Sequence, residues 1–233
     1  MRIVVNHLTR MDAPRICIAG IDPDAGRHIR PTTDHQHPLT RDLLASEGGP
    51  FALGALIELG QVIPDPKPPE TEDHLFQPSR ARVLGRLSPS RYLELLNEHA
   101  CDRLHEIFGD ELVRNGRTYA IDQDRGAASL GVLRVRRKPD LEVDRYGKLR
   151  LRLNDESKPA YLPVTDVRFV EPDHKTLEAE LVADLRTRMR RGVRVLLMLG
   201  LTRAFQKPGD DCERHWLQVN GICMADRPLA EQP

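Results

Sequence analysis

Two stretches with the same pattern, GVLRVRR at 131–137 and KLRLRL at 148–153, decide the fold class of this chain of 233 residues. In both, apolar and basic residues alternate, which is typical of a β-strand with one buried and one exposed face. The turn sequence DRYG at 144–147 lies between them, and together they predict a β-hairpin. Side chains two positions apart on a strand share a face. We therefore expect four arginines on one face of the hairpin: Arg134, Arg136, Arg150 and Arg152.

Short apolar and β-branched runs recur on both sides of this hairpin, separated by turns rich in Gly, Pro and Asp. Two amphipathic helices are predicted between them, one from Ser88 to Gly109 and one from about Asp173 to Gly192. Many short strands with only two helices favour small β-barrels over a parallel sheet, so we expect a mainly β (α+β) protein. The further strands are expected at 2–7, 15–20, 27–31, 51–63, 160–170, 194–202 and 215–223.

The two ends of the chain carry a similar pattern. ICIAG at 16–20, a loop and RHI at 27–29 are matched by LLMLG at 196–200, a loop and RHW at 214–216. A duplicated barrel would produce such a repeat. We therefore expect a first barrel at 1–85, a helical connector at 86–115 and a second barrel at 116–233 that carries the helix at 173–191, as separate parts or as one compact unit.

Composition restricts the class of protein. Lys plus Arg and Asp plus Glu both total 35, so the net charge is zero. That balance argues against a protein that coats nucleic acid by bulk charge, but it is compatible with a local basic patch. The opening residues do not form a secretory signal, and apolar runs such as 195–199 are too short to span a bilayer. Because the four cysteines lack CxxC spacing, we expect reduced thiols and a cytoplasmic protein with no membrane partner.

The four hairpin arginines are the main candidate site. Like charges that face each other destabilise a sheet pair, so such a cluster favours a bound anion. A phosphate backbone supplies that anion, and Tyr146 or Tyr161 could stack a base beside it. The alternative interpretation is a solvated face on which the arginines pair with Asp140, Glu142 and Asp144.

A nuclease is a disfavoured alternative. Asp140 after a proline, followed later by Glu156 and Lys158, matches the loose PD-(D/E)xK pattern of Mg²⁺-dependent nucleases. That chemistry needs the glutamate and lysine on a core strand, whereas here they lie in a polar turn that ends at Pro159. We therefore expect no enzyme activity.

Metal and cofactor sites are also weakly indicated. Asp34, His35 and His37 form one acid–imidazole group and residues 72–74 form another, but both lie in polar loops where such residues are common. There is no nucleophile elbow and no glycine-rich phosphate-binding motif in the sequence. We expect no metal and no cofactor.

Five landmarks occur in order along nearly the whole chain: 16–20 leading to 29–31, 51–59 followed by prolines and Glu72-Asp73, 162–166, 200–203 and 215–222. As a set they resemble the dual OB-containing domain family of bacteria, whose members have two linked OB-like barrels. The resemblance implies the fold and a nucleic-acid ligand, and it implies a link to prokaryotic defence systems. It implies no catalytic residues.

Together these observations predict a non-catalytic module that binds single-stranded or structured nucleic acid, as a sensor or accessory subunit whose cleavage activity comes from a separate effector protein. Besides the hairpin arginines and Tyr146, three residues at the echoed positions are weaker candidates for nucleic-acid contacts, namely Arg30, Arg203 and His215. The alternative is a protein-interaction adaptor whose basic face meets an acidic partner.

Overall fold

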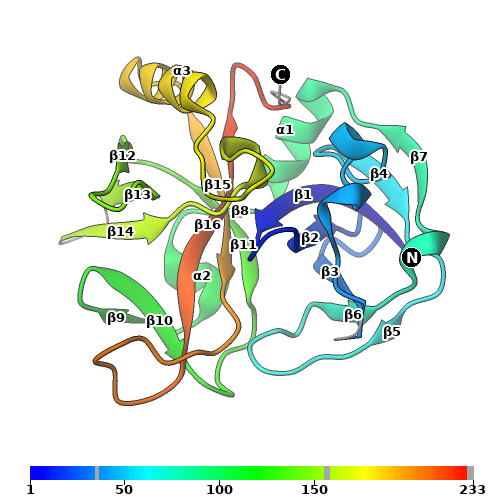
Figure 1. The fold of residues 1–233 in the computed structure, drawn as a ribbon, viewed down its shortest axis with the longest axis horizontal. Coiled ribbons are helices and arrows are strands. Elements are labelled where there is room, and N and C mark those ends of the chain that lie inside the picture. The colour runs from blue at the N-terminus through cyan, green and yellow to red at the C-terminus, as the bar shows by residue number, and fades with distance from the viewer. Residues whose placement is uncertain (35–36, 155–157, 230–233) are drawn as a thin grey trace.

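The computed structural model describes residues 1–34, 37–154 and 158–229, and its strands form two curled half-barrel sheets and a small third sheet (Figure 1). The first half of the chain forms a seven-stranded sheet in the order β5-β6-β3-β2-β1-β4-β7. The predicted mainly β fold is confirmed. The strands of this sheet are β1 (Arg2–Arg10), β2 (Ile16–Ile21), β3 (His28–Thr32), β4 (Ala55–Glu58), β5 (Ile63–Pro64), β6 (Asp73–Leu75) and β7 (Arg82–Arg86).

β1 is the strand from which the first barrel is built. It pairs antiparallel with β2 on one side and β4 on the other. Ile3 and Val5 enter the core of the first barrel, whereas Val4 packs in a separate cluster against the second half of the chain. The register of the β1–β2 pair shifts between Val5 and His7, which is a β-bulge. The strand predicted at 51–63 is reduced to β4 and the first residue of β5, because Gly54 and Gly60 on either side of β4 both adopt a positive φ of 74° and turn the chain.

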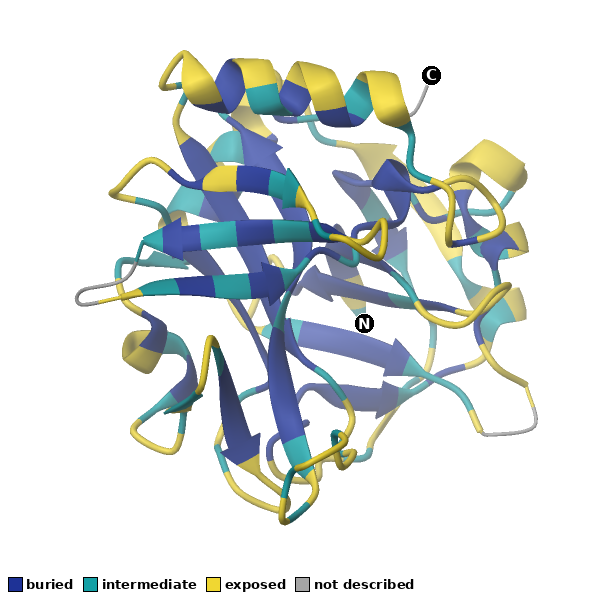
Figure 2. Ribbon diagram, turned by 60° about the vertical axis from the view of Figure 1, so that its left-hand side comes forward, coloured by how far each residue is buried: buried dark blue, intermediate teal, exposed yellow. Residues whose placement is uncertain are grey.

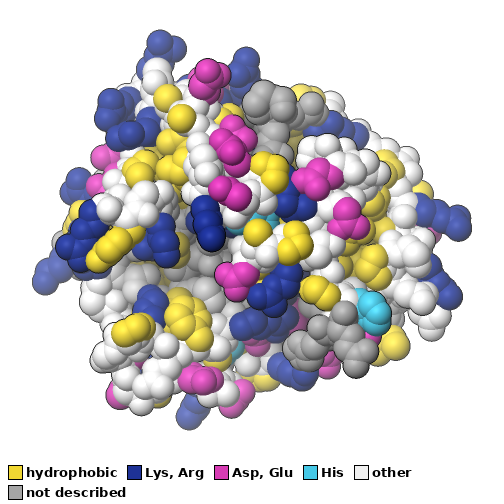
Figure 3. All heavy atoms as spheres, in the orientation of Figure 1, with side chains coloured by type: hydrophobic (Ala, Val, Ile, Leu, Met, Phe, Trp, Pro, Cys, Tyr) yellow, Lys and Arg dark blue, Asp and Glu magenta, His cyan; other side chains and the backbone are white. Residues whose placement is uncertain are grey.

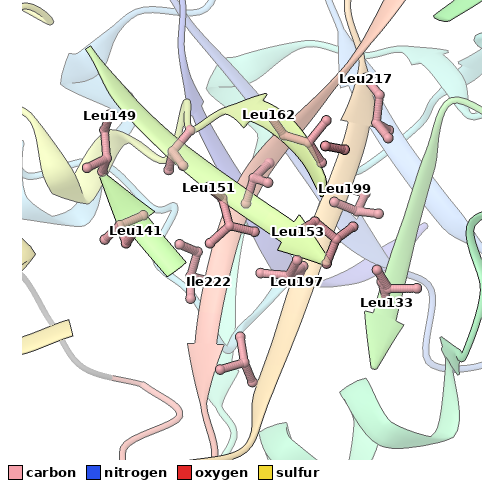
Figure 4. Packing of buried hydrophobic residues seen from close by; sticks show 14 of the residues in the cluster. Leu133, Leu141, Leu149, Leu151, Leu153, Leu162, Leu197, Leu199, Leu217 and Ile222 are labelled. Atoms are coloured by element: carbon pink, nitrogen blue, oxygen red, sulfur yellow. The ribbon is translucent and has the colours of Figure 1, made fainter. Parts of the chain in front are cut away.

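The second half forms a six-stranded sheet in the order β8-β11-β15-β16-β10-β9 and a three-stranded sheet in the order β12-β13-β14. Leucines from both sheets fill the space between them, and Leu151, Leu199 and Leu217 are fully buried there (Figure 4). The strands are β8 (Ala100–Cys101), β9 (Val113–Asn115), β10 (Thr118–Asp122), β11 (Leu130–Arg134), β12 (Asp140–Val143), β13 (Leu149–Asn154), β14 (Pro159–Pro163), β15 (Val195–Leu201) and β16 (Arg214–Met224).

The helix predicted from Ser88 to Gly109 is divided in two, α1 (Pro89–Glu98) and α2 (Leu104–Phe108). The Ser88 hydroxyl caps α1 by accepting from the Arg91 amide, as its position before a proline predicts. The chain then leaves the helix because β8 pairs in parallel with β11. α2 packs on Gly131, where an added Cβ would lie 2.2 Å from Ile107 Cγ2.

The last helix, α3 (Ala179–Arg190), begins later than the predicted position near Asp173. The Asp173 carboxylate accepts from the amides of Lys175 and Thr176 and so closes a turn rather than a helix. Gly192 ends the helix with a φ of 81°, as expected. None of the described helices is long and apolar enough to cross a membrane.

The two halves of the chain meet along a buried seam. β2 with β3 and β15 with β16, the pairs that carry the sequence echo, are both antiparallel. Residues of both halves form one apolar cluster in the seam, which includes Val4, Tyr92 and Met198. Hydrogen bonds also join the halves. The carboxylate of Glu72, the residue just before β6, accepts from the Ser129 amide at 2.8 Å and from the Leu130 amide at 3.1 Å. Apolar packing and hydrogen bonds therefore both join the two halves.

Candidate nucleic-acid interface

The predicted arginine hairpin does not form. The turn at 144–147 joins β12 to β13, and β13 pairs with β12 and β14. β11, which carries Arg134, pairs instead with β15 and β8 in the six-stranded sheet. Leu130 to Leu133 are all buried, which suits a strand inside a sheet, whereas β13 alternates buried and part-exposed residues. The expectation that the four arginines share one face is wrong.

Arg134 and Arg136 instead meet a single carboxylate. Their guanidinium groups lie 3.0 and 2.5 Å from the two oxygens of Asp102, in the segment between β8 and α2. The hydrogen bond from Arg136, with that from Arg134, lowers the pKa of Asp102 despite some opposing desolvation. Arg134 also donates to the carbonyl of Asn97. These contacts hold the helical segment against β11, so we assign the two arginines a structural role.

Arg150 and Arg152 are part-exposed on the outer face of the β12–β14 sheet. Figure 2 shows the alternation along β13: the leucines are buried and the residues between them are part-exposed. Tyr161 of β14 stands directly opposite Arg152, and Arg117 lies over its ring at 3.7 Å from the centroid. In Figure 3, Lys and Arg side chains gather over this part of the molecule.

Two further cations border this surface. Lys207, from the loop between β15 and β16, places Nζ 3.3 Å from the ring centroid of Trp216. Arg10, at the end of β1, donates to the carbonyls of His174 and Val164. We call the resulting surface the basic sheet face, defined by Arg10, Arg117, Arg150, Arg152, Tyr161 and Lys207.

Acidic residues neutralise only part of the basic sheet face. Asp144 pairs with Arg150 at 2.9 Å, as the solvated-face interpretation requires. Glu142 and Asp140 stand opposite Arg150 and Arg152 in the β12–β13 register, but neither makes an ion pair with a described residue. Arg152 Nε is buried and has no hydrogen-bond partner among the described residues.

The cations lie close enough to repel one another. Burial and the charge of Arg150 lower the pKa of Lys207 to about 8. The same two causes, burial first and Arg150 second, lower the pKa of Arg10. Because the cations repel one another, an anion that binds between them lowers the electrostatic energy of the cluster.

Trp216 is the one tryptophan of the chain and reports on Lys207. We expect its fluorescence to change with pH around a midpoint of about 8, as the ammonium above the ring loses its proton. Lys207→Met should abolish this transition, and Arg150→Ala should move the midpoint upward because a repelling charge is removed. A pH titration of emission measures both, and a midpoint near the ordinary lysine value of 10.5 in the wild type would contradict the expected cluster.

The three weaker candidates, Arg30, Arg203 and His215, come together in the seam. Arg30 Nε lies 2.5 Å from Asp73 Oδ1, and Arg203 Nη2 lies 2.6 Å from Asp73 Oδ2. His215 Nδ1 lies 3.3 Å from Glu70 Oε1. Burial opposes a charge on His215, but the hydrogen bond that its ring donates to the Glu70 carboxylate leaves the pKa of His215 raised. Because Arg30 and His215 are buried and face carboxylates, they cannot reach a phosphate backbone, and we assign them to the seam.

The metal and nuclease patterns gain no support from the geometry. Among the described residues no group of three His, Cys, Asp or Glu side chains could hold a metal ion, although His35 lies outside them. Glu156 of the nuclease pattern also lies outside the described residues. Asp140 begins β12 and accepts from the amide of Leu141, and Lys158 is exposed just before β14.

Arg10, Arg117 and Lys207 were not predicted as parts of the interface. Each joins the basic sheet face from a segment distant in sequence, so the local alternation that identifies Arg150 and Arg152 does not extend to them. Tyr161, one of the two candidate stacking residues, does lie on this face. Tyr146 lies outside it, exposed in the turn between β12 and β13.

Comparison with known proteins gives one match. A family model described as the dual OB-containing domain matches residues 1–222. No curated protein and no solved structure matches the chain.

Proposed function

The chain belongs to the dual OB-containing domain family, and from this premise we propose that it is a non-catalytic module that binds single-stranded or structured nucleic acid on its basic sheet face. The observation that supports this proposal is the arrangement of cations around Tyr161. Arg150 and Arg152 project from one strand, Arg117 stacks on the tyrosine, and Lys207 stands at the border. Phosphates and bases are the ligand groups that such a surface fits.

The proposal extends to the biological role suggested by the family resemblance. A module without catalysis would act as a sensor or accessory subunit of a prokaryotic defence system, with a separate effector protein supplying any cleavage. Incubation of the protein with Mg²⁺ and labelled strands should leave the strands intact. Cleavage that disappears in Glu156→Ala would overturn the non-catalytic part of the proposal.

Arg150→Ala/Arg152→Ala is the variant that tests the binding surface. We expect it to weaken binding to single-stranded DNA or RNA by about tenfold or more. It should also reduce the slope of log affinity against log salt by about 1.4, since each phosphate contact on a single strand contributes about 0.7. Fluorescence anisotropy with labelled single- and double-stranded DNA and RNA across a salt series measures both quantities.

Arg134→Ala/Arg136→Ala is a matched control with the same change of charge. Arg134 ends β11 in the six-stranded sheet, Arg136 follows it, and both pair with Asp102 away from the basic sheet face. Affinity and salt slope should therefore stay near the wild-type values. Equal losses in the two variants would show that net charge, and not the basic sheet face, governs binding. If the wild type binds none of the four nucleic acids at low salt, the proposal fails and a protein-interaction adaptor becomes the better interpretation.

A further inference from the structure

Three turns enclose a cavity beside the basic sheet face. It has a volume of about 620 Å³ and lies between residues 10–13 at the end of β1, residues 146–148 in the β12–β13 turn, and residues 173–177 before α3. The first turn belongs to one half of the chain and the other two belong to the second half. This volume is within the range of sites that hold small organic ligands. Arg10 lines the cavity and also belongs to the basic sheet face, so the two are continuous.

Two of the residues that line this cavity each have a buried polar atom with no hydrogen-bond partner among the described residues, His174 Nε2 and Arg10 Nε. Only 3% of His174 is exposed. Its Nδ1 lies 2.9 Å from the carbonyl oxygen of Met11, and because a carbonyl only accepts, Nδ1 carries the hydrogen. Nε2 of the neutral ring is then an acceptor, whereas Arg10 Nε is a donor. A ligand that satisfies both must offer a donor and an acceptor.

The remaining lining is mixed and includes one tyrosine, two lysines, three apolar side chains and two carboxylates: Tyr146, Lys148, Lys175, Met11, Ala13, Leu177, Asp12 and Asp173. The Asp12 carboxylate pairs with Arg15 at 3.1 Å. Tyr146 is 70% exposed, and Arg145 lies over its ring at 4.7 Å from the centroid. A second planar group could therefore stack on the free side of the tyrosine. Lys148 and Lys175 add positive charge, while the carboxylate of Asp173 is engaged by the hydroxyl and amide of Thr176.

We propose that this cavity binds one unstacked nucleotide of a single strand whose backbone follows the basic sheet face. The base stacks on Tyr146, the lysines meet the flanking phosphates, and His174 Nε2 and Arg10 Nε bind donor and acceptor groups of the base or ribose. A base edge carries both kinds of group, and so does a ribose hydroxyl. This inference rests on the proposed function, and it adds that the ligand must expose at least one base, which a continuous duplex does not do.

Tyr146→Ala is the direct test, because the exposed side chain can be removed without disturbing the core. We expect affinity for a labelled single-stranded oligonucleotide to fall by about fivefold or more, with the salt slope unchanged since no charge is lost. Tyr146→Phe, which keeps the ring, should bind as the wild type does. Val143→Ala is the matched control: this residue is exposed on the same hairpin but does not line the cavity.

The outcomes separate this inference from the proposed function. Salt-dependent binding that is lost in Arg150→Ala/Arg152→Ala but unchanged in Tyr146→Ala would overturn the nucleotide pocket and leave the basic sheet face in place. A strand of abasic residues should bind wild type and Tyr146→Ala equally, and a difference between them would also contradict base stacking. If no oligonucleotide binds, titration with adenosine monophosphate followed by saturation-transfer NMR tests the cavity alone, and no signal would overturn it.

Discussion

Asp73→Ala is expected to lower the free energy of unfolding by about 3–5 kcal/mol, because it leaves a buried arginine without its counter-charge. Arg30 and Asp73 have side chains that are each 6% exposed, and they lie side by side in the parallel pairing of β3 with β6. In the wild type the carboxylate receives Arg30 on one oxygen and Arg203 on the other. Arg203 is 54% exposed and can turn to solvent, but Arg30 cannot. The loss corresponds to a fall in melting temperature of about 10 °C for a chain of this size.

Asp24→Ala is the control for this prediction. Asp24 pairs with Arg2 at 2.8 Å, but both side chains are largely exposed to water, so its loss should change the unfolding free energy far less than the loss of Asp73 does. Arg30→Met/Asp73→Leu should recover part of the stability lost in Asp73→Ala, since it removes both buried charges. Chemical denaturation of the four proteins measures these differences. Equal stability of Asp73→Ala and Asp24→Ala would show that the seam does not depend on this ion pair.

The strands were predictable because the pattern of buried and exposed residues can be seen within each short segment of the sequence. β13 alternates buried leucines with part-exposed arginines, and that period of two is visible in the residues themselves. The cap at Ser88 and the stop at Gly192 are equally local and were placed correctly. Pairing is not local. The stretch 131–137 alternates apolar and basic residues as 148–153 does, yet the first four residues of β11 are buried, and only the position of β15 and β8 beside it shows this.

The candidate site was likewise predictable within one strand but not between distant segments. Arg150 and Arg152 were found because they alternate along one strand, but Lys207 reaches the basic sheet face through a loop in which nothing in the sequence distinguishes it from a solvated lysine. The echo between the ends of the chain singled out Arg203 and His215 as candidate nucleic-acid contacts, and in the structure both lie in the seam. The echo could not show that these two side chains pair with the carboxylates of Asp73 and Glu70, because those carboxylates lie more than a hundred positions away in the sequence.

Acid should destabilise the protein between about pH 6.5 and pH 4 through one buried histidine, His7, and one part-buried histidine, His28. His7 is 1% exposed, and neither ring nitrogen has a partner among the described residues. Burial, together with the nearby charges of His28 and Arg30, holds its pKa well below 6.5. Burial and the nearby His99 lower the pKa of His28 to about 4. The neutral state of His28 agrees with its contact to Asn6, whose amide lies 3.2 Å from His28 Nε2.

The direction of this effect follows from which state binds protons more tightly. A histidine with an ordinary pKa of 6.5 in the unfolded chain and a depressed pKa in the folded one binds its proton preferentially after unfolding. The associated stability is fully present above pH 6.5 and is lost as the pH falls. For His28, the difference between 6.5 and about 4 amounts to about 3 kcal/mol by pH 4.

His28→Gln is expected to remove most of its share of this acid sensitivity, because glutamine keeps a polar group near Asn6 but does not titrate. The free energy of unfolding, measured by urea denaturation from pH 8 to pH 4, should therefore fall less steeply in the variant than in the wild type. His105→Gln, at an exposed position on α2, should follow the wild-type curve. His215 acts in the opposite direction, because its raised pKa gives stability that is lost as the pH rises above 6.5. It therefore cannot cause the loss of stability between pH 6.5 and pH 4. Parallel curves for His28→Gln and the wild type would mean that His28 is accessible to protons in the folded protein.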